Sequence, residues 1–202
     1  MKLVVNEVVN MVVNILLFSF IPWIIYLFRN KTSKGFFKST GLFLSKFDIK
    51  KMLCIYTIMY LISLTSLFLM LKNGGSMALT SVNLKENSIL WNVLYFLLYG
   101  IKTGVSEEIF CRGFIGRKLF DKLGFEKGNI VQAFFFGIIH IVNLSQLGIL
   151  QTIHRILNAF VVGLVFGYVM EKEAEKSIVP GIVAHASYNA VSSAIISLFS
   201  MQ

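Results

Sequence analysis

The sequence predicts an all-α fold, a polytopic transmembrane helix bundle with about six spans. Hydrophobic residues make up 56% of the 202 residues, charged residues only 14%, and the mean hydropathy is +0.74. Soluble domains carry about 25% charged residues, so this chain has too few charges to cover a water-facing surface. The apolar residues also gather into runs that approach the roughly 20 residues needed to cross a bilayer as a helix.

Six apolar runs are the candidate spans. The second is the clearest, because its twenty residues include no charge. The first is predicted to be a retained span and not a cleavable signal peptide, since Glu7 interrupts it and no small-x-small cleavage site follows. No internal repeat is visible. The predicted spans are Val8–Phe28, Met52–Leu71, Ile89–Val105, Asn129–Leu144, Gly148–Met170 and Ile178–Phe199.

Basic residues concentrate in alternate loops. Arg29–Lys51 carries seven basic residues against Asp48 alone, and Gly113–Gly128 and Glu171–Ser177 carry four and two more. The opposite side carries only three, Lys2, Lys72 and Lys85. The positive-inside rule then predicts that the three basic segments face the cytoplasm and that both termini lie outside. Because these loops explain the net charge of +9, no nucleic acid partner is expected.

Ionisable residues lie in or beside the apolar runs. Each costs roughly 2.5–3.5 kcal/mol in a membrane helix unless a partner or water compensates it. We therefore expect these side chains to pair, to line a wet cavity or to sit at the interface. They are Glu107, Glu108, Arg112, His140, His154, Arg155 and His185.

The spacing of these residues forms three motifs, which belong to the third, fourth and sixth of these runs. Side chains four apart share one face of a helix, so each span can present one polar cluster to a common cavity. Any one motif has a structural explanation, as an ion pair or a helix-packing hydrogen bond, but three in one short chain favour a functional site. The motifs are Glu107-Glu108-x-x-x-Arg112, Phe136-x-x-x-His140 and His185-x-x-x-Asn189.

These residue types suit hydrolysis. A desolvated carboxylate such as Glu107 can take a proton from water. A histidine and an amide, here His185 and Asn189, can donate hydrogen bonds to a developing oxyanion. Arg112 can fix Glu108, which leaves the other carboxylate free to react.

The ordered motifs resemble the CAAX-protease and bacteriocin-processing family of intramembrane proteases, whose Rce1-type members cleave prenylated proteins. The motifs extend from Glu107 to Asn189, under half of the chain. The resemblance implies a protease core in the C-terminal four spans, residues 89–202, preceded by N-terminal spans and a basic cytoplasmic loop, residues 1–88. It also implies that His140 helps to hold or activate water. The implied catalytic residues are Glu107, Glu108, Arg112, His140, His185 and Asn189.

The sequence does not decide whether the site holds a metal ion. Two histidines and two glutamates could ligate zinc or another divalent metal, and Glu107, His140 and His185 would then be the ligands. No His-Glu-x-x-His motif is present, however, and the same residues support a metal-free glutamate mechanism, which we slightly favour. No other cofactor is predicted.

The remaining polar candidates receive structural interpretations. Cys54 and Cys111 give no disulfide framework. A thiol protease built on Cys111 and His140 is disfavoured, because no group that would orient the histidine is apparent. His154-Arg155 could touch substrate, but a helix-pairing or interfacial role is favoured. Tyr188 could line the site, but packing in the bundle is favoured.

Three functions remain in competition. The favoured one is an endopeptidase that cleaves a membrane-associated or exported peptide in bacteriocin self-immunity or peptide maturation. Its partners are a peptide or membrane-protein substrate and the lipid bilayer, and we expect a multi-pass protein of the bacterial plasma membrane. Water should reach Glu107 from the cytoplasmic side, since Glu107 follows the predicted third span. The alternatives are a non-catalytic membrane immunity or binding protein and a transporter, although the inverted repeats typical of transporters are not visible.

Overall fold

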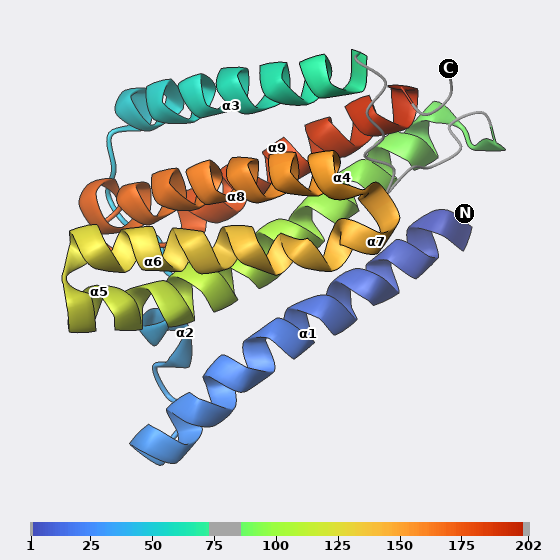
Figure 1. Ribbon diagram of the computed structural model, residues 1–202. Coiled ribbons are helices and arrows are strands. Elements are labelled where there is room, and N and C mark those ends of the chain that lie inside the picture. The colour runs from blue at the N-terminus through green and yellow to red at the C-terminus, as the bar shows by residue number, and fades with distance from the viewer. Residues whose placement is uncertain (1, 73–85, 200–202) are drawn as a thin grey trace.

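The computed structural model describes residues 2–72 and 86–199, and every regular element within these ranges is a helix. The predicted all-α fold is therefore confirmed (Figure 1). Two segments are π-helical and one is 3₁₀. The α-helices are α1 (Lys2–Asn30), α2 (Phe36–Ser39), α3 (Ile49–Lys72), α4 (Ile89–Glu107), α5 (Arg117–Leu123), α6 (Phe125–Ile138), α7 (Leu144–Leu147), α8 (Ile149–Tyr168) and α9 (Val179–Phe199).

Six helical stretches in the described ranges are long and apolar enough to cross a membrane, as predicted. The third differs from the prediction because it does not end at Val105. Instead, α4 continues through a π-helical segment, Glu108–Gly116, into α5, so that one stretch runs from Ile89 to Leu123. Glu107 consequently lies in the middle of this stretch, and the prediction that it lies near the end of a span is wrong.

The three basic segments meet at one end of the bundle. Arg117 donates hydrogen bonds to the carbonyl oxygens of Lys38 and Ser39, which joins the second segment to the first. Lys51 forms an ion pair of 2.7 Å with Glu173, which joins the first to the third. This end carries α2, α5 and the beginning of α3, on the left in Figure 1. The arrangement agrees with one charged face toward the cytoplasm.

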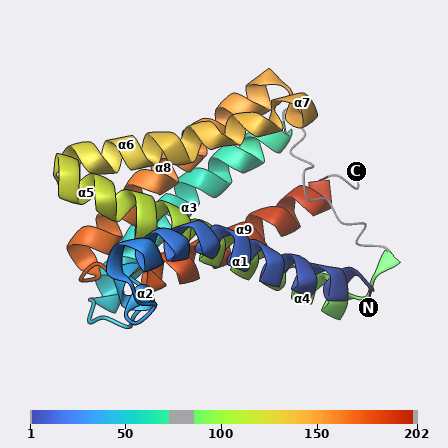
Figure 2. The same ribbon diagram turned by 90° about the horizontal axis from the view of Figure 1, so that it is seen from below.

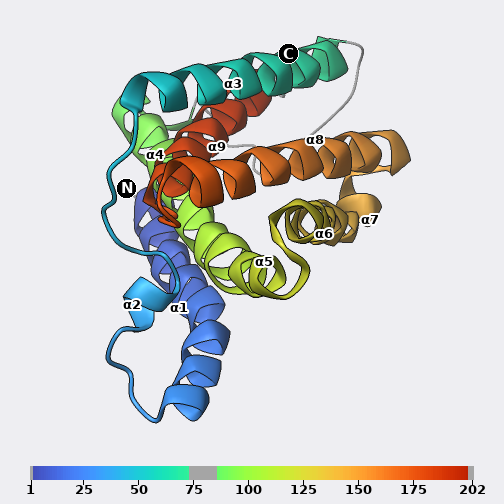
Figure 3. The ribbon, with the colours of Figure 1, turned by 90° about the vertical axis from the view of Figure 1, so that its left-hand side faces the viewer.

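Helices α4 and α9 approach each other closely at two glycines of α4. A methyl group added to Gly104 would lie 2.8 Å from the backbone nitrogen of Ala186, and one added to Gly100 would collide with the carbonyl of the same residue. Small residues four apart allow this kind of backbone contact between membrane helices, where dispersion and not the hydrophobic effect drives packing. The pairing of α4 with α9 is visible in Figure 3.

Helix α1 packs along α4, as Figure 2 shows from below. Many of its apolar side chains are exposed, among them Leu16 and Phe28, which suits a surface that faces lipid. Glu7 is buried, and its carboxylate pairs with Lys102 of α4 at 2.6 Å. A charge inside a bundle needs such a partner.

Candidate active site

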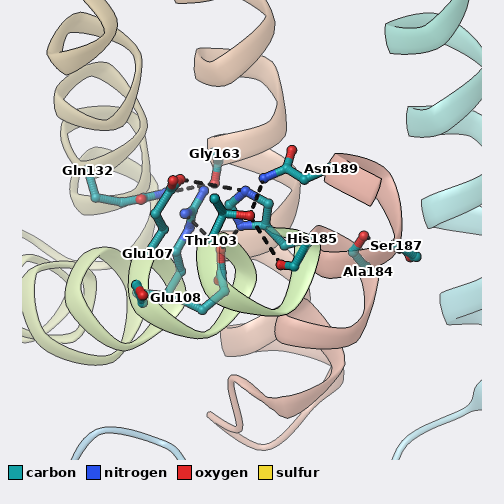
Figure 4. A network of polar contacts seen from close by, with 12 residues as sticks. Thr103, Glu107, Glu108, Gln132, Gly163, Ala184, His185, Ser187 and Asn189 are labelled. Carbon is teal, nitrogen blue, oxygen red and sulfur yellow. Dashed lines mark hydrogen bonds and ion pairs between the residues drawn. The ribbon is translucent and has the colours of Figure 1, made fainter. Parts of the chain in front are cut away.

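Glu108 forms the centre of a fully buried polar cluster behind the site. Its Oε1 accepts hydrogen bonds of 2.9 Å from Arg112 Nη1 and from His185 Nδ1 (Figure 4). The predicted pairing of Glu108 with Arg112 is thus confirmed. His185 of α9 is the third member of this cluster, because it binds the same oxygen of Glu108. Because a carboxylate only accepts, His185 Nδ1 carries the proton in this bond, and the other ring nitrogen is left facing away from Glu108.

The Arg112 guanidinium is held by aromatic rings as well as by Glu108. Its central carbon lies 4.0 Å from the centroid of Phe136 and 5.3 Å from that of Phe166. Within the described residues, Nε and Nη2 of this arginine have no hydrogen-bond partner. Ring faces attract cations most strongly where water is excluded. The rings of Phe136 and Phe166 therefore add to the stabilisation that the buried guanidinium receives from its one ion pair with Glu108.

Glu107 points in a different direction from Glu108, because adjacent residues on a helix differ by about 100° around its axis. Its side chain is 24% exposed, and its Oε2 lies 3.6 Å from His185 Nε2. That separation is too long for a good direct hydrogen bond but suits a bridging water. The two neighbouring carboxylates therefore have distinct environments. Glu108 is engaged by Arg112 and His185, whereas Glu107 is open to a cavity.

His140 lies where α6 changes into a 3₁₀ segment, Ile139–Asn143. Its Nδ1 donates a 2.9 Å hydrogen bond to the carbonyl oxygen of Phe136, and the two rings meet edge to face at 5.5 Å. With Nδ1 as the donor, Nε2 of the neutral ring is an acceptor. The sequence motif that places Phe136 one turn before His140 thus fixes the orientation of the histidine.

Asn189 lies one turn beyond His185 on α9. Its Nδ2 donates a 2.8 Å hydrogen bond to Oγ1 of Thr103 on α4 (Figure 4). Thr103 was not predicted as part of the site, although it precedes Glu107 by four residues and so shares its helix face. That spacing was the signal that could have identified it.

One cavity of about 100 Å³ brings these side chains together, which exceeds the space that one water molecule needs. Four of the six predicted catalytic residues line it, while Glu108 and Arg112 lie behind its wall. The predicted convergence of three motifs on a common cavity therefore matches the geometry, and the catalytic roles remain predictions. The lining residues with polar side chains include Thr103, Glu107, His140, His154, Arg155, Asn158, His185, Tyr188 and Asn189.

The comparison with protein families agrees with this geometry. The profile of the type II CAAX prenyl endopeptidase Rce1-like family matches residues 89–191, about half of the chain. The chain belongs to this family. No protein of curated function and no solved structure matches it.

Membership in the Rce1-like family identifies the chain as a membrane-embedded protease of endopeptidase type. A protease implies a peptide or protein substrate, and the six apolar helices imply a multi-pass protein in a lipid bilayer. The matched region contains α4, α6 and α8 completely and α9 through the site residues, so all three motifs lie inside it.

The cavity of this Rce1-like chain extends toward the end of the bundle opposite the basic segments. From Glu107 it runs to Leu67 and Ile196, which lie near the ends of α3 and α9 that are remote from those segments. On α4 it is lined by Tyr99 and Thr103, which precede Glu107 in the same direction. The expected access from the basic end is thus not supported by the cavity.

The side chains do not fit a metal site as they are arranged. No group of three histidine, cysteine, aspartate or glutamate residues within the described ranges is placed to hold a metal ion, and this includes Glu107, His140 and His185. Zinc sites use three or four protein ligands.

Helices α8 and α9 contribute more to the cavity than the sequence suggested. For His154 and Arg155 of α8 and Tyr188 of α9, a pairing or packing role was favoured, and all three line the cavity. His154 does pair helices as well, since its Nε2 lies 2.7 Å from Ser66 Oγ of α3. Asn158, which was not predicted, donates to the Tyr188 hydroxyl at 2.9 Å. Its position four residues after His154 was the available signal.

Cys111 does not take part in the site. Its side chain is buried, and it is not among the residues that line the cavity. A thiol nucleophile must be accessible to substrate and activated by a neighbouring base. The arrangement gives no support to the thiol mechanism that the sequence already disfavoured.

Proposed function

We propose that the chain is an intramembrane endopeptidase in which Glu107 activates a water molecule for attack on a peptide bond. One observation carries the proposal. Glu107, His140, His185 and Asn189 come from three separate membrane helices and line one cavity, while Glu108 and Arg112 form an ion pair behind it. Because Glu108 is held by Arg112, Glu107 is the carboxylate that is free to exchange protons with water in the cavity.

Glu107 is the general base in this mechanism. A water molecule in the gap between Glu107 Oε2 and His185 Nε2 can donate to the carboxylate, and His140 Nε2 supplies a second acceptor. The water oxygen bonds to the carbonyl carbon of the substrate as Glu107 takes the proton. When the C–N bond breaks, Glu107 returns this proton to the leaving nitrogen.

The carbonyl oxygen needs donors as its negative charge develops. Asn189 Nδ2 lies on the cavity wall and can turn from Thr103 toward the oxygen. His185 Nε2 donates when the ring carries both protons, and the bond from Nδ1 to Glu108 fixes the ring orientation. Of the two donors, His185 is held in place by its bond to Glu108, and a donor held in place before the reaction stabilises the oxyanion without reorganising.

Arg112 acts through Glu108. The guanidinium holds the Glu108 carboxylate in one position by a 2.9 Å hydrogen bond, and that carboxylate in turn fixes His185. Neither residue lines the cavity, so their role is to position and not to touch the substrate. This is the orienting function that a buried carboxylate serves for a catalytic histidine.

The decisive experiment follows cleavage in cells. Cells that carry the wild type, Glu107→Gln, His140→Ala or His185→Ala at matched membrane abundance would be compared by mass spectrometry of their peptides. We expect Glu107→Gln to lower cleavage by about 10²–10⁴-fold, because the amide cannot accept a proton, and an uncut precursor to accumulate. The control is Glu126→Gln, an exposed carboxylate on α6.

The pathway belongs to the same proposal. We infer a bacterial plasma-membrane enzyme that acts in bacteriocin self-immunity or peptide maturation. If protection against a bacteriocin survived Glu107→Gln and His140→Ala at normal abundance, the chain would instead be a non-catalytic immunity or binding protein. Full function of all three variants would exclude the catalytic proposal.

A further inference from the structure

We propose that Arg155 of α8 is a substrate-binding residue that pairs with a carboxylate of the peptide. The inference rests on the proposed function, because it names a chemical feature of the same substrate. Arg155 lines the cavity that holds Glu107 and is half-buried there. Nothing in the proposed chemistry uses it.

In the described part of the chain, Arg155 differs from two other basic residues inside the bundle in its lack of an ion pair. Lys102 pairs with Glu7, and Arg112 pairs with Glu108. Within the described residues, the Arg155 guanidinium has no carboxylate or carbonyl partner. A cation in a membrane helix requires compensation, and a cation on a cavity wall can receive it from a ligand.

The neighbours of Arg155 also favour an anion. His154 lies beside it on the cavity wall, and the buried His154 Nδ1 has no hydrogen-bond partner among the described residues, while its Nε2 is engaged by Ser66. If Ser66 donates to Nε2, Nδ1 carries a proton and is a second donor. Among the described residues that line the cavity, Glu107 is the only carboxylate, and its nearest basic group is His185 at 3.6 Å and not Arg155.

A guanidinium is the best cationic partner for a carboxylate, because its planar donors match the two oxygens. The site could receive either the C-terminal carboxylate of a peptide or an aspartate or glutamate side chain. Both sources present the same group to Arg155, so the experiment must separate them. In either case, the ion pair between the peptide and Arg155 of α8 determines which peptide bond lies next to Glu107.

The test measures peptide binding separately from cleavage. Full-length Glu107→Gln protein in phosphatidylcholine nanodiscs would be mixed with pooled short synthetic peptides, and the retained peptides would be identified by mass spectrometry. Each peptide is made with a free C-terminal carboxylate and with a C-terminal amide. Acidic peptides are also made with asparagine and glutamine in place of aspartate and glutamate.

The compared proteins carry Arg155→Gln or Arg155→Lys in addition to Glu107→Gln. The control is Arg117→Gln, because Arg117 is also half-buried but donates to carbonyl oxygens at the basic end. We expect Arg155→Gln to lower retention of the carboxylate peptides about tenfold or more and to leave neutral peptides unchanged. Arg155→Lys should restore part of the binding, since it keeps the charge.

The peptide forms identify the source of the carboxylate. A loss confined to free C-termini supports terminal recognition, and a loss confined to acidic side chains supports side-chain recognition. The proposal is overturned if charged and neutral peptides lose binding equally, if no peptide shows retention that depends on Arg155, or if retention follows phosphatidylglycerol in the nanodisc and not peptide charge.

Cleavage of the same peptides by protein with an intact Glu107 separates this inference from the proposed function. Binding that depends on Arg155 without any cleavage would contradict the proposed function alone. Cleavage with the same preference for charged and neutral peptides in Arg155→Gln as in the wild type would contradict this inference alone.

Discussion

Two ion pairs inside the bundle, each with one or both members on the Ile89–Leu123 stretch, invite comparison. The outer pair, Glu7 with Lys102, joins α1 to α4 at 2.6 Å. The inner pair, Glu108 with Arg112, lies within the π-helical segment at 2.9 Å and is the more deeply buried. Of these two carboxylates, Glu108 alone accepts a hydrogen bond from a third described residue, His185, which lines the cavity. The comparison indicates that ion pairs within one bundle can serve two purposes, since one pair assembles helices and the other orients a site.

Removing the inner cation should give the largest effect. Arg112→Ala leaves Glu108 as a buried charge without its partner, which destabilises a protein by about 3–5 kcal/mol. It also frees His185 from its fixed orientation, so cleavage should fall below detection. Thermal unfolding in detergent and peptide cleavage would be measured together.

Arg112→Lys sharpens this prediction because it keeps the charge but loses the planar contact with Phe136 and Phe166. We expect partial recovery of stability without full recovery of cleavage. If Arg112→Ala retained wild-type cleavage in folded protein, the inner pair would be no more than a second structural pair.

A wedge between α4 and α9 should have an intermediate effect. Gly104→Val places a branched side chain against the backbone of Ala186, and overpacking of this kind costs about 1–3 kcal/mol. Because Glu107 and Thr103 lie on α4 while His185 and Asn189 lie on α9, cleavage should fall more than stability does. Leu97→Val, at a half-exposed position on α4, is the control. Equal losses of cleavage in the two variants would show that helix spacing is not critical.

Replacing the whole outer pair should have the smallest effect. The double variant Glu7→Leu with Lys102→Met removes both charges, and apolar replacement of a buried pair is often neutral or stabilising by about 1–4 kcal/mol. Cleavage should remain close to that of the wild type. Each single variant, measured by thermal unfolding, should be less stable than the double variant. A large loss of cleavage in the stable double variant would break the distinction between the two pairs.

The sequence predicted what depends on spacing along one chain segment. The pairing of Glu108 with Arg112 follows from their separation of four residues, and the number of spans follows from hydropathy. The π-helical segment was not predictable, because it depends on packing between helices and leaves no periodicity signal of its own. It is the reason why the third span extends past Val105 and why Glu107 is central.

The cavity wall was only partly predictable. Ionisable residues such as Arg155 attract attention in an apolar run, whereas Thr103 and Asn158 are common in membrane helices and cost little. Their contribution depends on which face of each helix turns inward, and this is settled by contacts between distant segments. The direction in which the cavity extends depends on the same contacts.

The close glycine contacts divide the cavity into fixed and adjustable walls. Backbone contact fixes α4 against α9 at Gly104 and α6 against α8 at Gly137. Within the described ranges, α3 has no such glycine contact, and it contributes Leu67 to the lining. Leu67 is therefore the position at which peptide selectivity could be redesigned without disturbing the hydrolytic groups, and an inhibitor selective for this chain should be directed against it.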